Sequence, residues 1–182
     1  MQLAEQKKKN NIIEYLLFMY QMEDLMRSCN LNINAVVARF IEPHVQDQKL
    51  VDDCKRWYGH IIDDLKSFNR EKHGHVSEVY EIQMELFYLH NSLITVTPNE
   101  EYVALYAETQ PFINEFRDKT PMQFNDIDLC IHALYMKLLL KMQGKDISET
   151  TENAFDKMKN LLVQLAKAYH KMKSGDVAFH LN

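Results

Sequence analysis

The fold is decided by two stretches that are apolar on almost every side of a helix. The first is IIEYLLFMYQM at residues 12–22, and the second is IDLCIHALYMKLLLKM at residues 127–142. A surface helix needs only one apolar stripe, whereas a helix that is apolar nearly all round is buried or spans a membrane. Polar residues interrupt both stretches, and neither reaches the roughly 20 apolar residues of a membrane span. We therefore expect two central helices of an all-α protein, covered by the other helices.

Composition supports one globular domain that binds neither nucleic acid nor membrane. The chain has 182 residues, of which 46% are hydrophobic and 26% charged, as in ordinary globular domains. Its net charge of −5 disfavours nucleic acid as a partner, and the only basic cluster, Lys7-Lys8-Lys9, is short. No sustained basic amphipathic helix suggests a membrane surface. The three cysteines are far apart and form neither a disulfide framework nor a zinc motif, which favours a reducing cytoplasm.

Glycine and proline, the residues that most often interrupt helices, are scarce, and this predicts long helices. With only four glycines and four prolines, the sequence divides into about seven helices. Helix-start signals at Thr97, Thr120 and Asp146 mark the last three of them. We predict a single-domain multi-helix bundle over residues 1–173 and a tail over 174–182. The expected helices cover residues 2–28, 33–46, 47–71, 76–95, 98–118, 121–143 and 147–173.

Some polar residues fall among apolar neighbours by helical phase. Asp128 and His132 lie one turn apart in the second stretch, so their side chains are expected to be neighbours. Gln83 and His90 lie on the apolar face of the fourth expected helix, and Glu14 interrupts the first stretch. Such groups either form a structural hydrogen-bond network that sets helix register or line a small ligand pocket. Both interpretations stay open from the sequence.

Histidines also offer weak candidates for metal binding. His73 and His75 flank a glycine, and His60 precedes Asp64 by one helical turn. A metal site needs three or four ligands, and the sequence supplies no complete set. We therefore predict no metal and no cofactor, and name these four residues only as weak candidates. Motifs for phosphate binding, dinucleotide binding, zinc proteases and serine hydrolases are absent, so no catalytic residue is predicted.

Several segments resemble an uncharacterised bacterial family of about this length, a domain of unknown function. The resemblance rests on residues 11–25, on Glu71-Lys72-His73-Gly74-His75, and on the runs 133–140 and 146–150. It would cover most of the chain. The resemblance implies a cytoplasmic, all-helical bacterial protein, and it assigns no activity or catalytic residue.

Three functions remain open at this point. We expect a non-catalytic helical protein that acts through protein–protein interaction, with a homodimer as the default oligomer. The abundance of Tyr and Met, which are enriched at interfaces, favours it. One alternative is a small-ligand binder with a pocket between the two central helices. The other is a metal-dependent hydrolase built from scattered His and Asp residues. Whether the protein is an enzyme stays uncertain, although the missing motifs argue against it.

Overall fold

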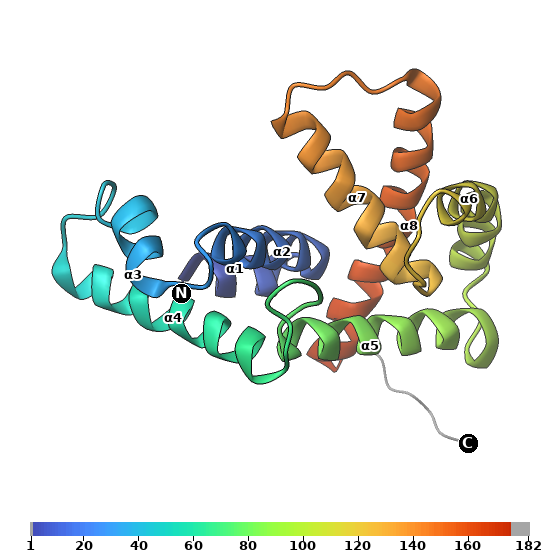
Figure 1. The fold of residues 1–182 in the computed structure, drawn as a ribbon. Coiled ribbons are helices and arrows are strands. Elements are labelled where there is room, and N and C mark those ends of the chain that lie inside the picture. Colours follow the sequence, from blue (N-terminus) through green and yellow to red (C-terminus); the bar gives the residue numbers. More distant parts are fainter. Residues whose placement is uncertain (1, 176–182) are drawn as a thin grey trace. The chain divides into compact units, whose positions relative to one another are not determined.

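The computed structural model describes residues 2–175 and is all-α over that range (Figure 1). It contains eight α-helices and two short π-helical segments, and no strand occurs among the described residues. The prediction of an all-α fold is thereby confirmed. The elements are α1 (Gln2–Asn10), α2 (Ile12–Ser28), α3 (Ile33–Val36), η1 (Val37–Ile41), α4 (Gln48–Ser67), α5 (Ser77–Asn91), η2 (Ser92–Val96), α6 (Glu100–Asp118), α7 (Asp126–Met142) and α8 (Glu149–Ser174).

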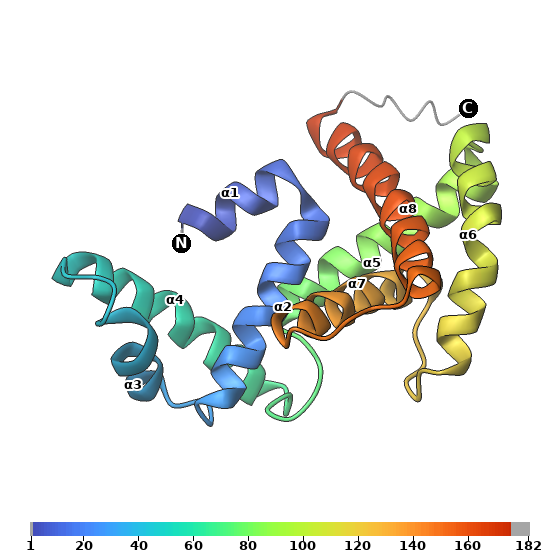
Figure 2. The same cartoon turned by 90° about the horizontal axis from the view of Figure 1, so that it is seen from above.

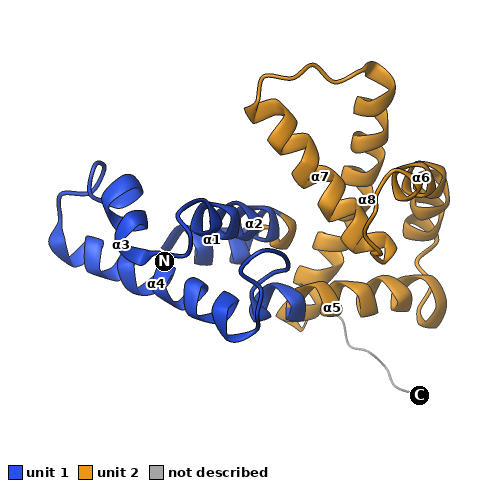
Figure 3. Ribbon diagram, viewed as in Figure 1, with its two compact units in different colours: residues 1–10, 14–81 blue, residues 11–13, 82–182 orange. Residues whose placement is uncertain are grey.

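The chain divides into two compact units (Figure 3). Unit 1 comprises residues 1–10 and 14–81, and unit 2 comprises residues 11–13 and 82–182. The prediction that residues 1–173 form one domain stays a prediction. Of the tail predicted at 174–182, residues 176–182 lie outside the described residues, and Ser174 is the last residue of α8.

The count of helices differs from the predicted seven because the first predicted helix is two helices. The amide of Ile13 donates to the Asn11 side-chain oxygen at 3.0 Å, so Asn11 caps the start of α2. Two helix starts also lie further along the chain than their Thr-Pro signals. Asn99 caps α6 and Asn125 caps α7, each through its side-chain oxygen. Asparagine is preferred over threonine as an N-cap, and each helix begins after the asparagine rather than after Thr97 or Thr120.

Unit 1 packs α2 against α4. The rings of Phe18 and Trp57 lie 6.1 Å apart, and the Tyr58 hydroxyl donates to the Met22 sulfur at 3.6 Å. The α4 helix is amphipathic, and its start is fixed by Asp47, which accepts from the amides of the first turn. Its buried side chains recur at helical spacing, as expected for a helix with one solvent-exposed face. They are Val51, Cys54, Tyr58, Ile61, Ile62 and Leu65.

Unit 2 is built around α6, α7 and α8, which pack on one another (Figure 1 and Figure 2). The first half of α7 is buried on every side, since the consecutive residues Leu129, Cys130 and Ile131 have no exposed surface. Its second half is more open, and Met142 is 68% exposed. The all-round apolar pattern therefore marks the centre of this unit only up to Tyr135.

No helix within residues 2–175 combines the length and the apolar character that crossing a bilayer requires.

Candidate functional site

The densest polar cluster of unit 1 surrounds the connection between α4 and α5, which we call the His75 loop (residues 68–76). The chain leaves α4 with Asn69 at φ 56° and turns again at Gly74 with φ 92°. The amide of Arg70 donates to the carbonyl of Leu65 at 2.7 Å, which closes the end of α4. The loop thus has a defined backbone path, set by its two left-handed residues.

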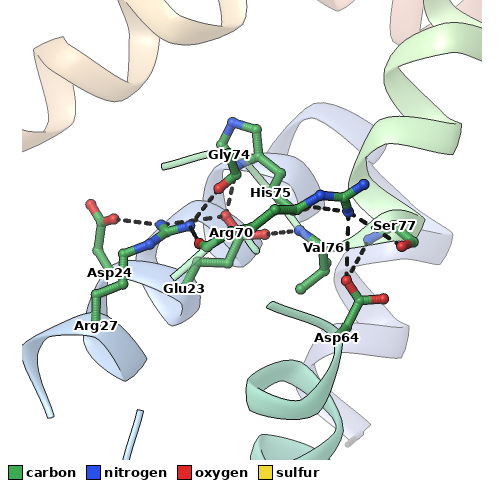
Figure 4. A network of polar contacts seen from close by, with 9 residues as sticks. All are labelled: Glu23, Asp24, Arg27, Asp64, Arg70, Gly74, His75, Val76 and Ser77. Carbon is green, nitrogen blue, oxygen red and sulfur yellow. Dashed lines mark hydrogen bonds and ion pairs between the residues drawn. The ribbon is translucent and has the colours of Figure 1, made fainter. Parts of the chain in front are cut away.

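A buried carboxylate from α2 holds this loop (Figure 4). The side chain of Glu23 has no exposed surface. One of its oxygens accepts from the amide of Val76 at 2.8 Å, and the other lies 2.6 Å from Nδ1 of His75. A buried carboxylate is tolerated only when its oxygens are satisfied, and these two contacts satisfy both. Glu23 therefore fastens the His75 loop to α2.

Two arginines complete the attachment with bonds to loop carbonyls (Figure 4). Arg27, one turn after Glu23 on α2, donates to the carbonyls of Arg70 and Gly74. Arg70 in turn donates to the carbonyl of His75 at 2.8 Å and lies 3.6 Å from Asp64 of α4. Because backbone carbonyls of a loop have few partners of their own, these bonds fix its shape.

Aromatic rings enclose the imidazole of His75. The ring of Tyr20 stacks on it with centroids 3.9 Å apart and planes 12° apart, and the ring of Tyr80 meets it edge-on at 5.8 Å. The His75 side chain remains 22% exposed. With its Nδ1–H donating to Glu23, the imidazole keeps its Nε2 as the remaining site for a proton or a ligand. Within residues 2–175, no third His, Cys, Asp or Glu side chain joins this pair to form a metal site.

The turn at Gly74 supports a testable prediction about the loop. A side chain there would sit in the left-handed region, and its Cβ would lie 2.9 Å from the Tyr80 hydroxyl. We expect Gly74→Ala to lower the free energy of unfolding by about 1–2 kcal/mol. Urea unfolding measures this loss. Gly144→Ala is the control because Gly144 also has a positive φ, 65°, but open space around its Cβ. Equal losses in both variants would show that the contact with Tyr80 is immaterial.

Unit 2 has its own polar cluster, centred on His90 of α5. His90 is 4% exposed, and its Nδ1 shares a hydrogen bond of 2.7 Å with the hydroxyl of Tyr102. Its ring also meets the ring of Tyr106 edge-on at 4.8 Å. The Tyr106 hydroxyl donates to Asp126, which also pairs with Arg117. The buried imidazole therefore has one hydrogen bond, to Tyr102, and a ring contact with Tyr106, whose hydroxyl bonds to the partly buried ion pair of Asp126 and Arg117.

Burial decides how the groups of this cluster ionise. It lowers the pKa of His90, and the Asp126 carboxylate offsets part of that effect. Burial raises the pKa of Tyr102 and of Tyr106, and the bond to Asp126 raises that of Tyr106 further. At neutral pH the cluster therefore holds a neutral imidazole and two protonated phenols.

The lowered pKa of His90 predicts acid sensitivity. An unfolded histidine titrates near pH 6.5. Below that pH the unfolded chain binds a proton that folded His90 refuses, so stability is full above about pH 6.5 and is lost as the pH falls. We expect His90→Gln, which keeps a hydrogen-bonding group, to lose less stability than the wild type between about pH 7.5 and 5.5. Urea unfolding at both pH values measures the difference, and parallel losses in the two proteins would contradict the prediction.

The remaining candidates of the sequence lie on α2, α5 and α7. Asp128 accepts from the Asn125 side chain at 2.6 Å in the first turn of α7, and His132 stacks on Phe124 with centroids 5.0 Å apart. Gln83 is 5% exposed within α5. Glu14 differs from its expected place in a polar core, since its side chain is 61% exposed. Glu14 lies on the solvent-exposed side of α2, in the first turn of the helix.

The four weak metal candidates do not converge. His60 and His73 are exposed, whereas His75 and Asp64 serve the His75 loop through Glu23 and Ser77. Within residues 2–175, no group of three or more His, Cys, Asp or Glu side chains is placed to hold a metal ion.

The sequence interpretation missed Glu23, although a signal for it existed. Glu23 falls on the same side of α2 as Leu16, Met19 and Met26, each no more than 2% exposed. The apolar run ends at Met22, one residue short of it. In unit 2, helical phase alone places Asp126 and Cys130 toward solvent, yet Cys130 has no exposed surface. Because α7 is buried all round at that point, it has no solvent side there.

A family comparison places the chain in a family whose description assigns no chemistry. Residues 1–176 match the family described as domain of unknown function DUF4924. The chain belongs to this family. The resemblance noted from residues 11–25 onward is thereby confirmed, and its coverage of nearly the whole chain agrees with the extent of the match. No curated protein and no solved structure matches the chain.

Proposed function

We propose that this protein is a non-catalytic helical protein that acts by binding other protein chains, including a second copy of itself. The observation that carries the proposal is an exposed pair of large side chains on α5. Tyr88 is 63% exposed and Met84 46% exposed, and the two lie one turn apart on the same face. Aromatic and methionine side chains are enriched where protein chains meet. The polar clusters support the proposal because their contacts serve to hold loops and helices in place.

Co-purification of two differently tagged copies tests the proposal. Both copies are expressed in one cell, one is captured through its tag, and the retained amount of the other is measured. We expect retention in a stoichiometric amount. The control exchanges the two tags, which excludes an effect of the tags themselves. Absence of the second copy in both arrangements would contradict self-association.

A hollow in unit 2 favours a second candidate function, the binding of a small ligand. It has a volume of about 310 Å³ and lies between α6 and α8, with Phe116, Phe155 and Met158 among its lining residues. Lys119, paired with Glu115 at 2.7 Å, adds charge at its edge. Ligand sites are typically apolar hollows of about 300–1,000 Å³ with a few polar groups. Extra mass on the native protein that disappears in Ala154→Phe would support this candidate, and a bare chain would contradict it.

A further inference from the structure

The solvent-exposed side of α4 in unit 1 carries a regular arrangement of charges beside a shallow hollow. A shallow hollow of about 490 Å³ runs along this helix, and Leu31 and Ile33 form its other wall. Gly59 lies midway along the lining of α4, and a Cβ there would meet no atom within 4 Å. Glycine inside a helix costs about 1 kcal/mol of stability relative to alanine. An alanine would fit at position 59, so packing within unit 1 does not require the glycine. The lining residues of α4 are Asp52, Lys55, Arg56, Gly59, Ile62, Asp63 and Lys66.

Charges on this face are arranged in mirror order about Gly59. Lys55 lies four residues before Gly59, and Asp63 lies four residues after it. Asp52 lies seven residues before Gly59, and Lys66 lies seven residues after it. These two pairs of positions therefore carry opposite charges at equal distances from Gly59, whereas Arg56, three residues before it, corresponds to the uncharged Ile62.

These charges are available to a partner. Lys55, Asp63 and Lys66 are exposed, and none of them forms an ion pair within residues 2–175. Asp52 is exposed as well and accepts one hydrogen bond, from Gln48 at 3.0 Å. Arg56 pairs with Asp53, and the other charged side chains of this face are open to solvent without an ion pair within the described residues.

We infer that α4 of one copy packs antiparallel on α4 of a second copy, with the two helices crossing at Gly59. A two-fold axis at Gly59 places Lys55 of each copy opposite Asp63 of the other, and Asp52 opposite Lys66. In a parallel arrangement like charges would face each other, so the pattern selects the antiparallel one. The missing side chain at Gly59 lets the helix backbones approach closely. This inference rests on the proposed function: it assigns self-association to α4 of unit 1, and the exposed pair Met84 and Tyr88 on α5 remains a surface for other protein chains.

Ion pairs and apolar packing contribute differently to this contact. Exposed ion pairs add little affinity each, and their part is to fix orientation and register. Affinity would come from the half-buried apolar side chain of Ile33 and from close packing at Gly59. Lys49, on the same helix, lies outside the lining of the hollow, is exposed, and forms no ion pair within residues 2–175, so it should take no part.

Two charge reversals test the pairing by sedimentation velocity. Lys55→Glu places two glutamates against two aspartates across the axis, and Asp63→Lys places lysines against lysines. We expect each variant alone to dimerise at least about tenfold more weakly than the wild type, because like charges face each other in both.

Mixing the two variants should restore the contact. The new glutamate of one variant then faces the new lysine of the other, and the native Asp63 of the first faces the native Lys55 of the second. A heterodimer should therefore form with near wild-type affinity. Lys49→Glu is the matched control, because it reverses a charge on the same helix outside the hollow, and it should leave the dimer unchanged.

A cysteine cross-link tests the crossing point independently of charge. The native cysteines Cys29, Cys54 and Cys130 are all buried, so a new surface thiol reports on its own surroundings. Gly59→Cys should form a disulfide-linked dimer under mild oxidation, and Asp53→Cys should not.

The outcomes separate this inference from the proposed function. A wild type of single-chain mass would contradict self-association and the α4 contact together. A wild-type dimer that both charge reversals leave intact, or that Gly59→Cys fails to cross-link, would overturn the α4 contact alone. Weakened single variants, a restored mixture and a Gly59 cross-link together would establish it.

Discussion

Replacing Glu23 by alanine should lower the free energy of unfolding by about 3 kcal/mol, the largest effect that we expect from any polar substitution. Glu23 is fully buried and satisfies the amide of Val76 and Nδ1 of His75, both in the His75 loop. Its removal leaves a buried amide without an acceptor and removes the attachment of the loop to α2. Arg27, whose guanidinium lies 4.0 Å from Glu23, also loses a nearby negative charge.

Urea unfolding measures this loss of stability. Two further variants show how much of it comes from the buried contacts of Glu23. Asp24→Ala is the matched control, because Asp24 is the next residue on the helix and its side chain is 51% exposed. Its ion pair with Arg27 at 3.2 Å is a surface pair, worth about 0–1 kcal/mol. Glu23→Gln retains one acceptor oxygen and should lose less stability than Glu23→Ala. An effect of Glu23→Ala no larger than that of Asp24→Ala would refute the account of the loop.

Truncating Ile131 to alanine should cost about 3 kcal/mol of stability. Ile131 has no exposed surface and lies in the part of α7 that is buried on every side. Deleting its outer carbons removes apolar contact and leaves a cavity that the closely packed neighbours fill only in part. The loss should appear as a lower urea midpoint with an unchanged helix content.

The control for this substitution lies on the same helix. Met136 is 37% exposed, so Met136→Ala removes a side chain of similar size from a half-open position. We expect it to cost less than about 1 kcal/mol. Similar losses for Ile131 and Met136 would show that the two halves of α7 do not differ in packing.

The apolar pattern of the sequence predicted which helix segments are buried, because burial follows composition over a whole turn. The consecutive buried residues of α7 up to Tyr135 and the low exposure of Leu16 and Met19 in α2 agree with the interpretation, whereas residues 136–142 are more open than it predicted. The ends of helices were harder to predict. Asn11, Asn99 and Asn125 act as caps beside competing signals, and the choice between neighbouring caps depends on contacts outside the local sequence.

The polar clusters could be predicted only in part. Helical phase places Gln83 and His90 on an apolar face, and both are buried in the structure. Their partners could not be predicted, since Tyr102 approaches His90 from another helix. The pairing of Glu23 with His75 joins residues far apart in the sequence and depends on the path of the His75 loop. The left-handed turn at Gly74 that shapes this path needs glycine, but glycine alone does not reveal what the turn brings together.

Native mass spectrometry of the purified, untagged protein tests the central claim, self-association, most directly. It weighs the intact assembly and anything bound to it in one measurement. Our account predicts a mass of two bare chains. A mass of one chain at every protein concentration would contradict self-association, and one chain with a bound small molecule would favour the ligand-binding function instead.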